Sequence, residues 1–553
     1  MLKEMNIKKI SRLVGLWMCL LLVACADDKG NYSYQDKAII TIEGISQIVS
    51  VLAGAEYIDI KPMVTSSLEG VIDDKNPNFE FLYQRKNSDG EWVEIAHQKD
   101  LYQLASLSSG THAFIFSVMD KRTEVQTLKL FYVNATTITS EGWMVLCNEG
   151  AEERVRLDML AQLSVDRIIP AYDVILRADG VPEQYHATNL GFYSTGGSNG
   201  NRIIMMSEDA AYRLRTSDGD KGFTDFVELN SDNELKQAMF LTSTDDHIVN
   251  FVDVPYKGQY TPNHDAVICV SKEGNAYAWN VVLQETGFEY PINTSIRGGT
   301  PEYRVAPYVG TTLKRPVEQE FGLALLFDTD NHRFVYWSGE GGSTNEEKKQ
   351  VLHLLEDPAN KLFSYNTGNM DLVCMLSTNF SEGTVYCIMQ DGSKRHIYGF
   401  NLASEEIKQT ACIQDIKTDD FTLASCFAAS SQYYVIYYAC GNKVYAYNLG
   451  TGISEPVISL EGEEVTCLKF NRYDYPWGID YLCAKYDDDV KSIYQARENQ
   501  LIVGSWKSDA TDNNGGVLRF YNVESSGMKL TLKPGWEYSG FAKIKDIRYK
   551  EIR

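Results

Sequence analysis

The stretch Gly274–Asn280 reads GNAYAWN, and Gly441–Asn448 reads GNKVYAYN, which is nearly the same sequence. A weaker third copy, GGVLRFYN, occupies Gly515–Asn522. Each copy combines a glycine-containing turn with a short strand rich in aromatic residues and a closing asparagine. Short strands that recur with a period of about 40 to 60 residues are typical of β-propellers. These copies therefore predict a propeller in this part of the chain.

The same order of turn, aromatic strand and turn extends beyond these copies. It recurs in NHRFVYW at Asn331–Trp337 and in GTVYCIMQDGSKRHIYGFN at Gly383–Asn401. At this period, residues 141–553 accommodate a propeller-like domain of about seven blades. A pair of packed β-sandwiches is the alternative. Helices are expected only as insertions, at Asn345–Asp357 and, more weakly, at Asp232–Phe240.

Residues 38–135 have a different pattern of short β-branched and aromatic runs separated by turn signals. In FEFLYQRKNSDGEWVEIA, the pair Asp89-Gly90 separates two alternating segments, which is a strong hairpin signal. In HAFIFSVMD, apolar residues occupy both alternating faces, so both faces are expected to be partly buried. About one hundred residues of this kind predict an immunoglobulin-like β-sandwich, and the whole chain is expected to be all-β.

The N-terminal residues 1–24 are predicted to be a lipoprotein signal peptide. Four basic residues precede an uncharged run, LVGLWMCLLLVA, which is too short to span a bilayer that needs about 20 helical residues. Cys25 follows directly, and Asp27 and Asp28 come after one alanine. Residues 25–37 then read as a tether. An ordinary secretory signal with a coincidental cysteine is the alternative.

Three segments together resemble a known family: CADDKGNYSY at 25–34, FIFSVMDKRTEVQTLKLFYV at 114–133 and EGWMVLCNEG at 141–150. They resemble the PKD-like lipoproteins of Bacteroidetes, which accompany SusD-like lipoproteins and TonB-dependent transporters. The resemblance implies that Cys25 is lipidated and that Asp27 and Asp28 form the export signal to the outer face of the outer membrane. It also implies SusC/SusD-type partners in nutrient uptake. The aspartates could instead be only a soluble start to the mature chain.

Charge and cysteine content limit the classes of function. The formal net charge is −23, and removal of the signal segment, with four basic residues and one acidic residue, leaves −26. Such a chain is expected to repel nucleic acid and anionic polysaccharide and to favour neutral or cationic oligomers. The cysteines after Cys25 are odd in number, so they cannot all pair within the chain. The sequence contains no CxxC pair, which would be the usual sign of a zinc site.

Local catalytic and metal motifs are weak. Gly196–Gly200 fits G-x-S-x-G, but a strand-like segment follows where a nucleophile elbow needs a helix. Asp328 and Asp330 resemble the start of a calcium loop, but Arg333 replaces the required glycine. We therefore expect no catalytic residues, no metal site and no cofactor.

Binding through aromatic side chains remains as the main expectation. Tyrosines and tryptophans in turn-rich segments are candidates for surface contacts, although their ligand is unknown: Tyr185, Tyr193, Tyr260, Tyr473, Tyr475 and Trp477. The sequence thus favours a non-catalytic accessory protein that binds glycan or peptide at the cell surface. A surface propeller enzyme, either a polysaccharide hydrolase or lyase or a peptidase, is the alternative, because glycan-active carboxylates leave no local motif.

Overall fold

The chain forms two compact units. One comes mainly from residues 37–133, and the other comprises the described residues from 134 onward with the short segments 50–57 and 104–111. The computed structural model describes residues 37–175, 183–194, 201–216, 223–228, 246–254, 266–280, 290–296, 298–312, 323–338, 351–403, 406–473, 488–507, 509–510 and 513–551.

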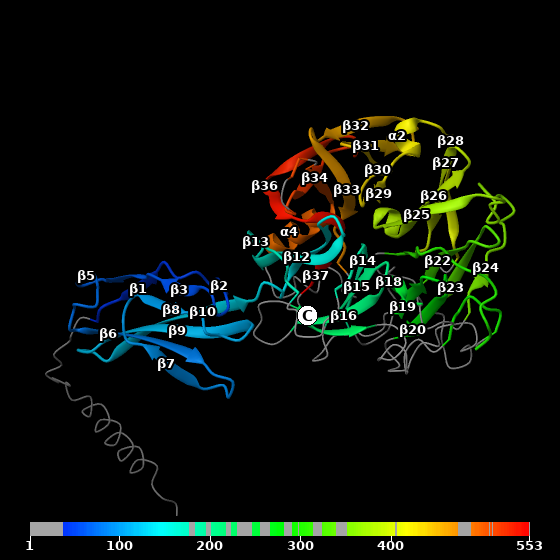
Figure 1. The fold of residues 1–553 in the computed structure, drawn as a ribbon. Helices are drawn as coiled ribbons and strands as arrows, with labels where there is room; N and C mark the ends of the chain where they lie inside the picture. The colour runs from blue at the N-terminus through cyan, green and yellow to red at the C-terminus, as the bar shows by residue number, and fades with distance from the viewer. Residues whose placement is uncertain are drawn as a thin grey trace, which may run out of the picture. The chain divides into compact units, whose positions relative to one another are not determined.

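The N-terminal region is a β-sandwich (Figure 1). Phe81, Tyr83, Phe114, Phe116 and Phe131 are buried between its sheets, and the rings of Tyr83 and Phe116 lie 4.5 Å apart. Its strands are β1 (Ile40–Glu43), β2 (Ile48–Leu52), β3 (Tyr57–Ile60), β4 (Met63–Ser66), β5 (Gly70–Val71), β6 (Phe79–Lys86), β7 (Trp92–Ala96), β8 (Leu101–Leu104), β9 (Gly110–Asp120) and β10 (Val125–Thr136). They form sheets β1-β4-β5, β2-β10-β9-β6-β7 and β3-β8.

The predicted hairpin at Asp89-Gly90 is confirmed. Strands β6 and β7 pair in antiparallel register with Lys86 opposite Trp92. Gly90 has φ +86°, a left-handed conformation that glycine adopts without strain. Short-range turn chemistry was therefore sufficient to locate this connection.

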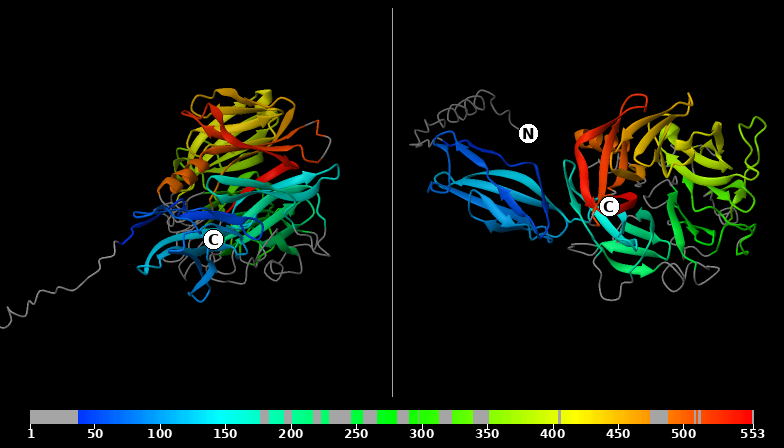
Figure 2. Two further views of the ribbon diagram at one scale, coloured as in Figure 1. Left: turned by 90° about the vertical axis from the view of Figure 1, so that its left-hand side faces the viewer. Right: turned by 45° about the horizontal axis from the view of Figure 1, so that its top comes forward.

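The second unit is a β-propeller built, in its described residues, from seven sheets, as Figures 1 and 2 show. The expected number of about seven blades is confirmed. In chain order, the sheets are β13-β12-β11-β37, β14-β15-β16-β17, β18-β19-β20, β21-β22-β23-β24, β25-β26-β27-β28, β29-β30-β31-β32 and β33-β34-β35-β36.

The first four sheets contain β11 (Gly142–Glu149), β12 (Arg154–Ser164), β13 (Arg167–Ala171), β14 (Ala187–Ser194), β15 (Asn201–Ser207), β16 (Ala211–Thr216), β17 (Phe223–Glu228), β18 (Ile248–Val254), β19 (Ala266–Ser271), β20 (Ala276–Asn280), β21 (Gly310–Thr311), β22 (Leu323–Asp328), β23 (Arg333–Ser338) and β24 (His353–Leu354), with β37 (Lys543–Lys550) added to the first. The last three contain β25 (Asp371–Thr378), β26 (Thr384–Asp391), β27 (Lys394–Asn401), β28 (Lys408–Ile416), β29 (Cys426–Ala429), β30 (Val435–Cys440), β31 (Lys443–Asn448), β32 (Ser454–Ser459), β33 (Glu463–Phe470), β34 (Gln500–Lys507), β35 (Gly516–Val523) and β36 (Leu530–Phe541).

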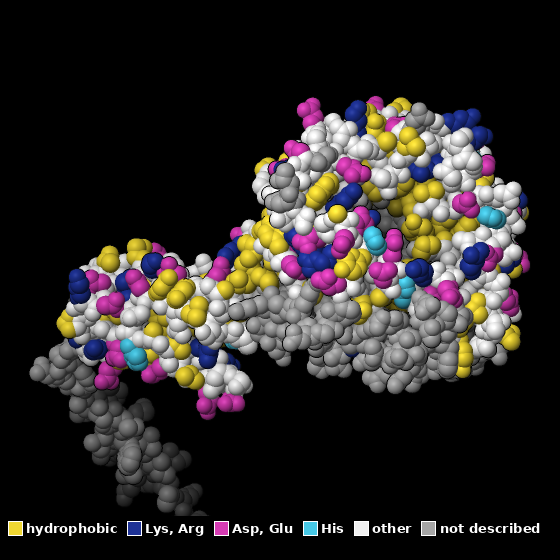
Figure 3. All heavy atoms as spheres, viewed as in Figure 1, with side chains coloured by type: hydrophobic (Ala, Val, Ile, Leu, Met, Phe, Trp, Pro, Cys, Tyr) yellow, Lys and Arg dark blue, Asp and Glu magenta, His cyan; other side chains and the backbone are white. Residues whose placement is uncertain are grey.

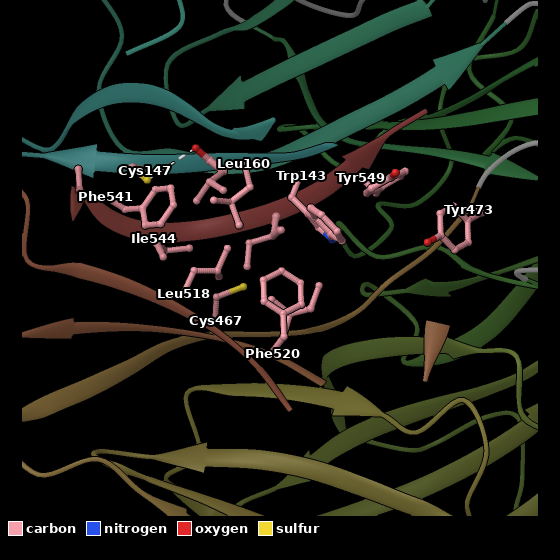
Figure 4. Packing of buried hydrophobic residues seen from close by; sticks show 14 of the residues in the cluster. Trp143, Cys147, Leu160, Cys467, Tyr473, Leu518, Phe520, Phe541, Ile544 and Tyr549 are labelled. Atoms are coloured by element: carbon pink, nitrogen blue, oxygen red, sulfur yellow. Dashed lines mark hydrogen bonds between the residues drawn. The ribbon is translucent and has the colours of Figure 1, made fainter. Parts of the chain in front are cut away.

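The C-terminal strand completes the first sheet of the propeller. Strand β37 pairs with β11, placing Tyr549 opposite Trp143, so the two ends of the propeller sequence share one sheet. Trp143 is buried against Phe520 of the last sheet, with ring centroids 5.1 Å apart (Figure 4). Burial of such large aromatic surfaces stabilises the junction between the first and last sheets.

One strand of each sheet lies at the centre of the ring. Contacts join β37 to β14, β14 to β18, β21 to β25, β25 to β29, β29 to β33, and β33 to β37. Polar side chains add specific bonds between these strands. Asn189 donates to the carbonyl of Val249 at 3.1 Å, and Lys469 pairs with Asp546 at 2.6 Å. The inner strands are therefore fixed to one another by side chains as well as by packing.

Helices are short in the described part of the chain: η2 (Phe380–Glu382), α2 (Asp419–Thr422) and α4 (Asp488–Glu498). None of them has the length and apolar character to cross a bilayer. The predicted helix at Asn345–Asp357 is wrong over its described residues 351–357, where His353–Leu354 pairs with the edge of β23 instead. The weaker helix predicted at Asp232–Phe240 lies outside the described residues.

Candidate functional site

The propeller carries a pocket of about 610 Å³ between the turns and links of its third, fourth and fifth sheets. Such a volume is within the range of small-molecule and oligomer sites. We call it the Arg304 pocket. Its described lining is Lys272, Glu273, Gly274, Arg304, Val305, Ala306, Pro307, Phe327, Thr329, Asp371 and Leu372. Figure 3 shows the kinds of side chain on one face of the propeller, where hydrophobic and charged side chains lie close to one another.

The first wall of the pocket is the turn between β19 and β20. The amide of Gly274 donates to the carbonyl of Ser271 at 2.9 Å, and Gly274 has φ +85°. A Cβ atom on Gly274 would lie 2.8 Å from Cβ of Arg304. Only glycine therefore lets the link that carries Arg304 approach this turn. This glycine begins the GNAYAWN repeat, so a residue typical of the fold also shapes the pocket.

The second wall is the link that carries Arg304, which is held from both sides. The amide of Val305 donates to the carbonyl of Gly274 at 2.8 Å, and the amide of Thr329 donates to the carbonyl of Arg304 at 2.9 Å. The Arg304 side chain pairs with Asp330, whose Oδ1 accepts from Nε at 2.9 Å and from Nη2 at 2.6 Å. Arg304 is nevertheless 69 % exposed. Its cation is thus both oriented and accessible.

Asp328 organises the turn that presents Asp330. Asp328 is fully buried, and its Oδ1 accepts from the amides of Asp330 and Asn331 at 3.1 and 3.0 Å. Its Oδ2 accepts from Nε of Arg333 at 2.8 Å. The aspartates that resemble a calcium loop in the sequence therefore form a turn and an ion pair. The Arg304 guanidinium holds the pKa of the Asp330 carboxyl below its usual range.

Asp371 adds an exposed carboxylate to the lining of the pocket. The preceding link is anchored by His332, whose Nδ1 lies 3.0 Å from the carbonyl of Met370 and whose own carbonyl accepts from Oγ1 of Thr367 at 2.7 Å. Oδ1 of Asp371 lies 3.7 Å from Nδ1 of His332, and the Asp371 side chain is 79 % exposed. The carboxylate can therefore meet a ligand directly.

The arrangement suits binding of a molecule that carries no large net charge. Two cations, Lys272 and Arg304, share the rim with two anions, Glu273 and Asp371, so its formal charge is zero. Apolar residues such as Val305 and Leu372 also belong to the lining. A lining of apolar residues with a few oriented polar groups is the usual composition of a ligand site.

A second charged group joins inner strands of the propeller. Asp253 on β18 pairs with Arg472 at 2.7 Å and with Arg548 of β37 at 3.3 Å. All three side chains are largely buried, and they connect the third sheet with the first and the last. We interpret this group as structural: it joins sheets of the ring, and the negative charge of the buried carboxylate is already balanced by two guanidinium groups.

Only some of the residues that the sequence analysis singled out lie in the described part of the chain. Cys25, Asp27 and Asp28 lie outside the described residues, as do Gly196–Gly200 and three of the aromatic candidates, Tyr260, Tyr475 and Trp477. The side chain of Tyr193 is also outside the description, whereas Tyr185 is partly exposed.

Tyr473 corrects one expectation. It was predicted to lie at the surface, yet it is only 4 % exposed and packs against Tyr494 of helix α4, with ring centroids 5.7 Å apart. Helix α4 begins at Asp488, in a part of the sequence where no helix was predicted. The turn-rich composition around this helix concealed it, and its Tyr494 and Arg497 bond to Gln162 of the first sheet.

Comparisons with known proteins agree with the N-terminal resemblance. Residues 25–184 match the model of the PKD-like family, which confirms the PKD-like character of this region. No curated protein matches the chain.

Several solved structures are weakly similar to this chain. A quinonprotein alcohol dehydrogenase-like protein from Bacteroides thetaiotaomicron is 9% identical, with 93% of this chain and 100% of that chain covered and a TM-score of 0.38. A protein from Lactobacillus plantarum is 10% identical, with 74% and 100% covered and a TM-score of 0.39. The β-propeller domain of Cps50 (Swd1) from Myceliophteria thermophila is 11% identical, with 63% and 93% covered and a TM-score of 0.29. Similarities this low carry no argument about function.

Proposed function

We propose that this chain is a lipid-anchored, non-catalytic binding protein on the outer face of the outer membrane. In this proposal it acts with a SusD-like lipoprotein and a TonB-dependent transporter in the uptake of glycan or peptide. Cys25 carries the lipid, and Asp27 and Asp28 direct the protein to the surface. The support for this role comes from the signal segment in the sequence and from the PKD-like match over residues 25–184.

The observation that carries the binding role is the arrangement of charges in the Arg304 pocket. Arg304 is oriented by Asp330, and the turn below it is fixed by buried Asp328. Preorganised groups of this kind lose little conformational entropy when a ligand arrives. A pocket whose charged groups are already held in place is well suited to capture.

The test combines binding and turnover in one sample. The purified full chain is incubated with oligosaccharide and peptide mixtures, and bound species are identified by native mass spectrometry. New reducing ends, unsaturated sugars and free amines are measured in the same samples. Binding without new products is expected. Product formation at a rate proportional to protein concentration would contradict the non-catalytic role.

A surface enzyme is the second candidate, favoured by the neighbouring His332 and Asp371. A histidine and a carboxylate 3.7 Å apart beside a pocket can provide acid–base chemistry. However, Nδ1 of His332 lies 3.0 Å from the carbonyl of Met370, which gives this histidine an anchoring role. If turnover were observed and His332→Ala abolished it while ligand binding persisted, the enzyme candidate would replace the binding protein.

A further inference from the structure

We propose that the ligand of the Arg304 pocket is a short peptide carrying charges of both signs, and not an oligosaccharide. This inference rests on the proposed binding function and specifies its ligand class. It follows from three properties of the described lining: the presence of charges of both signs, the absence of an accessible aromatic ring among these residues, and the aliphatic side chains beside the charges.

The rim favours a ligand with charges of its own. Arg304 and Asp371 are largely exposed, and Lys272 uses Nζ to donate to the carbonyl of Glu208 at 2.9 Å. A neutral sugar could form hydrogen bonds to these charged groups, but it carries no opposite charge that would replace the hydration that they lose on binding. A peptide can place carboxylates against the cations and ammonium groups against Asp371, which restores charge-assisted bonds.

The described lining offers no ring face for a sugar. Recognition of sugars commonly uses the exposed face of an aromatic side chain against the apolar face of the pyranose. Phe327 is the single aromatic residue in the described lining, and it is fully buried, with its ring 5.2 Å from that of Phe334. The ring is therefore part of the core beneath the pocket and is not a stacking platform.

The apolar part of the lining instead suits aliphatic side chains. Pro307 is exposed and Leu372 is partly exposed, so these two apolar side chains can meet a ligand, whereas Val305 and Ala306 are buried. An extended peptide alternates its side chains, so that apolar and charged groups can meet such a surface in turn. The net charge of −23 adds a long-range attraction for peptides with an excess of basic residues.

The experiment measures affinity with defined probes. The purified full chain is titrated with a tryptic digest of casein and, separately, with maltoheptaose and cellohexaose, and bound species are quantified by native mass spectrometry. Two variants remove rim charges, Lys272→Met and Asp371→Asn. Two matched controls remove other charges, Lys529→Met and Asp59→Asn, because both residues form exposed ion pairs and neither belongs to the described lining of the pocket.

We expect peptides to bind to the wild type. Each rim variant should weaken peptide binding about tenfold, because it loses a hydrogen bond to a charged group. The two control variants should bind peptides as the wild type does. Peptide binding that is equal in all variants would overturn the assignment of the pocket. Binding of the oligosaccharides alone would overturn the peptide inference and leave the proposed binding function in place. If no probe bound, both would fail. Circular dichroism of each variant establishes that it is folded.

Discussion

Replacing Gly274 with alanine tests whether this glycine is required by close packing at the pocket. The new Cβ would lie 2.8 Å from Cβ of Arg304 and 3.2 Å from the carbonyl oxygen of Val305. Carbon atoms pack at about 3.5 to 4.0 Å, so the overlap with Arg304 is at least about 0.7 Å. The link must move away, which changes the wall of the pocket.

The magnitude follows from two contributions. A left-handed conformation costs a non-glycine residue about 1 to 2 kcal/mol, and overpacking costs about 1 to 3 kcal/mol. Alanine also lowers the conformational entropy of the unfolded chain, and this effect offsets about 0.4 to 1 kcal/mol of the destabilisation. We therefore expect Gly274→Ala to lower the free energy of unfolding by about 2 to 4 kcal/mol.

Gly441→Ala is the matched control, because Gly441 begins the other close copy of the repeat. It also has positive φ, +60°, but its Cβ would meet no atom within 4 Å. This variant shares the backbone strain and the unfolded-state effect, and lacks the overlap. The difference between the two variants, about 1 to 3 kcal/mol, therefore isolates the close packing.

Urea unfolding followed by tryptophan fluorescence measures this difference, since Trp143 and Trp337 are buried in the propeller. Peptide affinity should fall for Gly274→Ala and remain unchanged for Gly441→Ala. Equal losses of stability in the two variants, within about 0.5 kcal/mol, would refute the reasoning, because the contact with Arg304 would then contribute nothing.

Three further predictions concern closure, pH and anchoring. Deletion of 543–553 removes β37 and should make the whole propeller sensitive to limited proteolysis, whereas a protected fragment would contradict closure. Burial lowers the pKa of Lys550 to about 8, so at this residue the unfolded state binds more protons between about pH 8 and 10, and the contribution of Lys550 to stability should rise with pH there by up to about 1.4 kcal/mol per unit. Urea unfolding at pH 7.5 and 9.5 should show that Lys550→Met loses this rise; the same pH dependence in both proteins would contradict it. Cys25→Ala should release the protein from membranes in cell fractionation, and joint replacement of Asp27 and Asp28 by alanine should leave it lipidated but protected from protease added to intact cells. Protection of the wild type would contradict surface display.

The propeller could be predicted because its signal is local and repeated. A turn such as that at Gly274 and the aromatic strand after it lie within a few residues of each other, and the same unit recurs at Gly441. The wrong helix has a physical explanation. The apolar residues around Leu352 and Leu354 fit a helical face, but the free edge of β23 supplied hydrogen-bond partners, and tertiary pairing outweighed local propensity.

The pocket could not be predicted from local patterns. Lys272, Arg304, Thr329 and Asp371 come from four separate turns and links, and they meet only because successive sheets pack around one axis. Helix α4 was missed for a related reason. Tyr494 and Arg497 lie three residues apart on one face of it, but their partners, such as Gln162, belong to the first sheet.

The repeat also explains how one regular fold can hold an individual site. The amide of Val305 donates to the carbonyl of Gly274 at 2.8 Å, and the amide of Val465 donates to the carbonyl of Gly441 at 2.9 Å. This bond between neighbouring sheets uses only backbone atoms, so it places no demand on the side chain that precedes the valine. That residue is Arg304 in the first case and Glu464, paired with Lys543 at 3.3 Å, in the second. The fold therefore fixes the position of these side chains while leaving their charge free to vary, and the character of the Arg304 pocket depends on residues that the fold does not require.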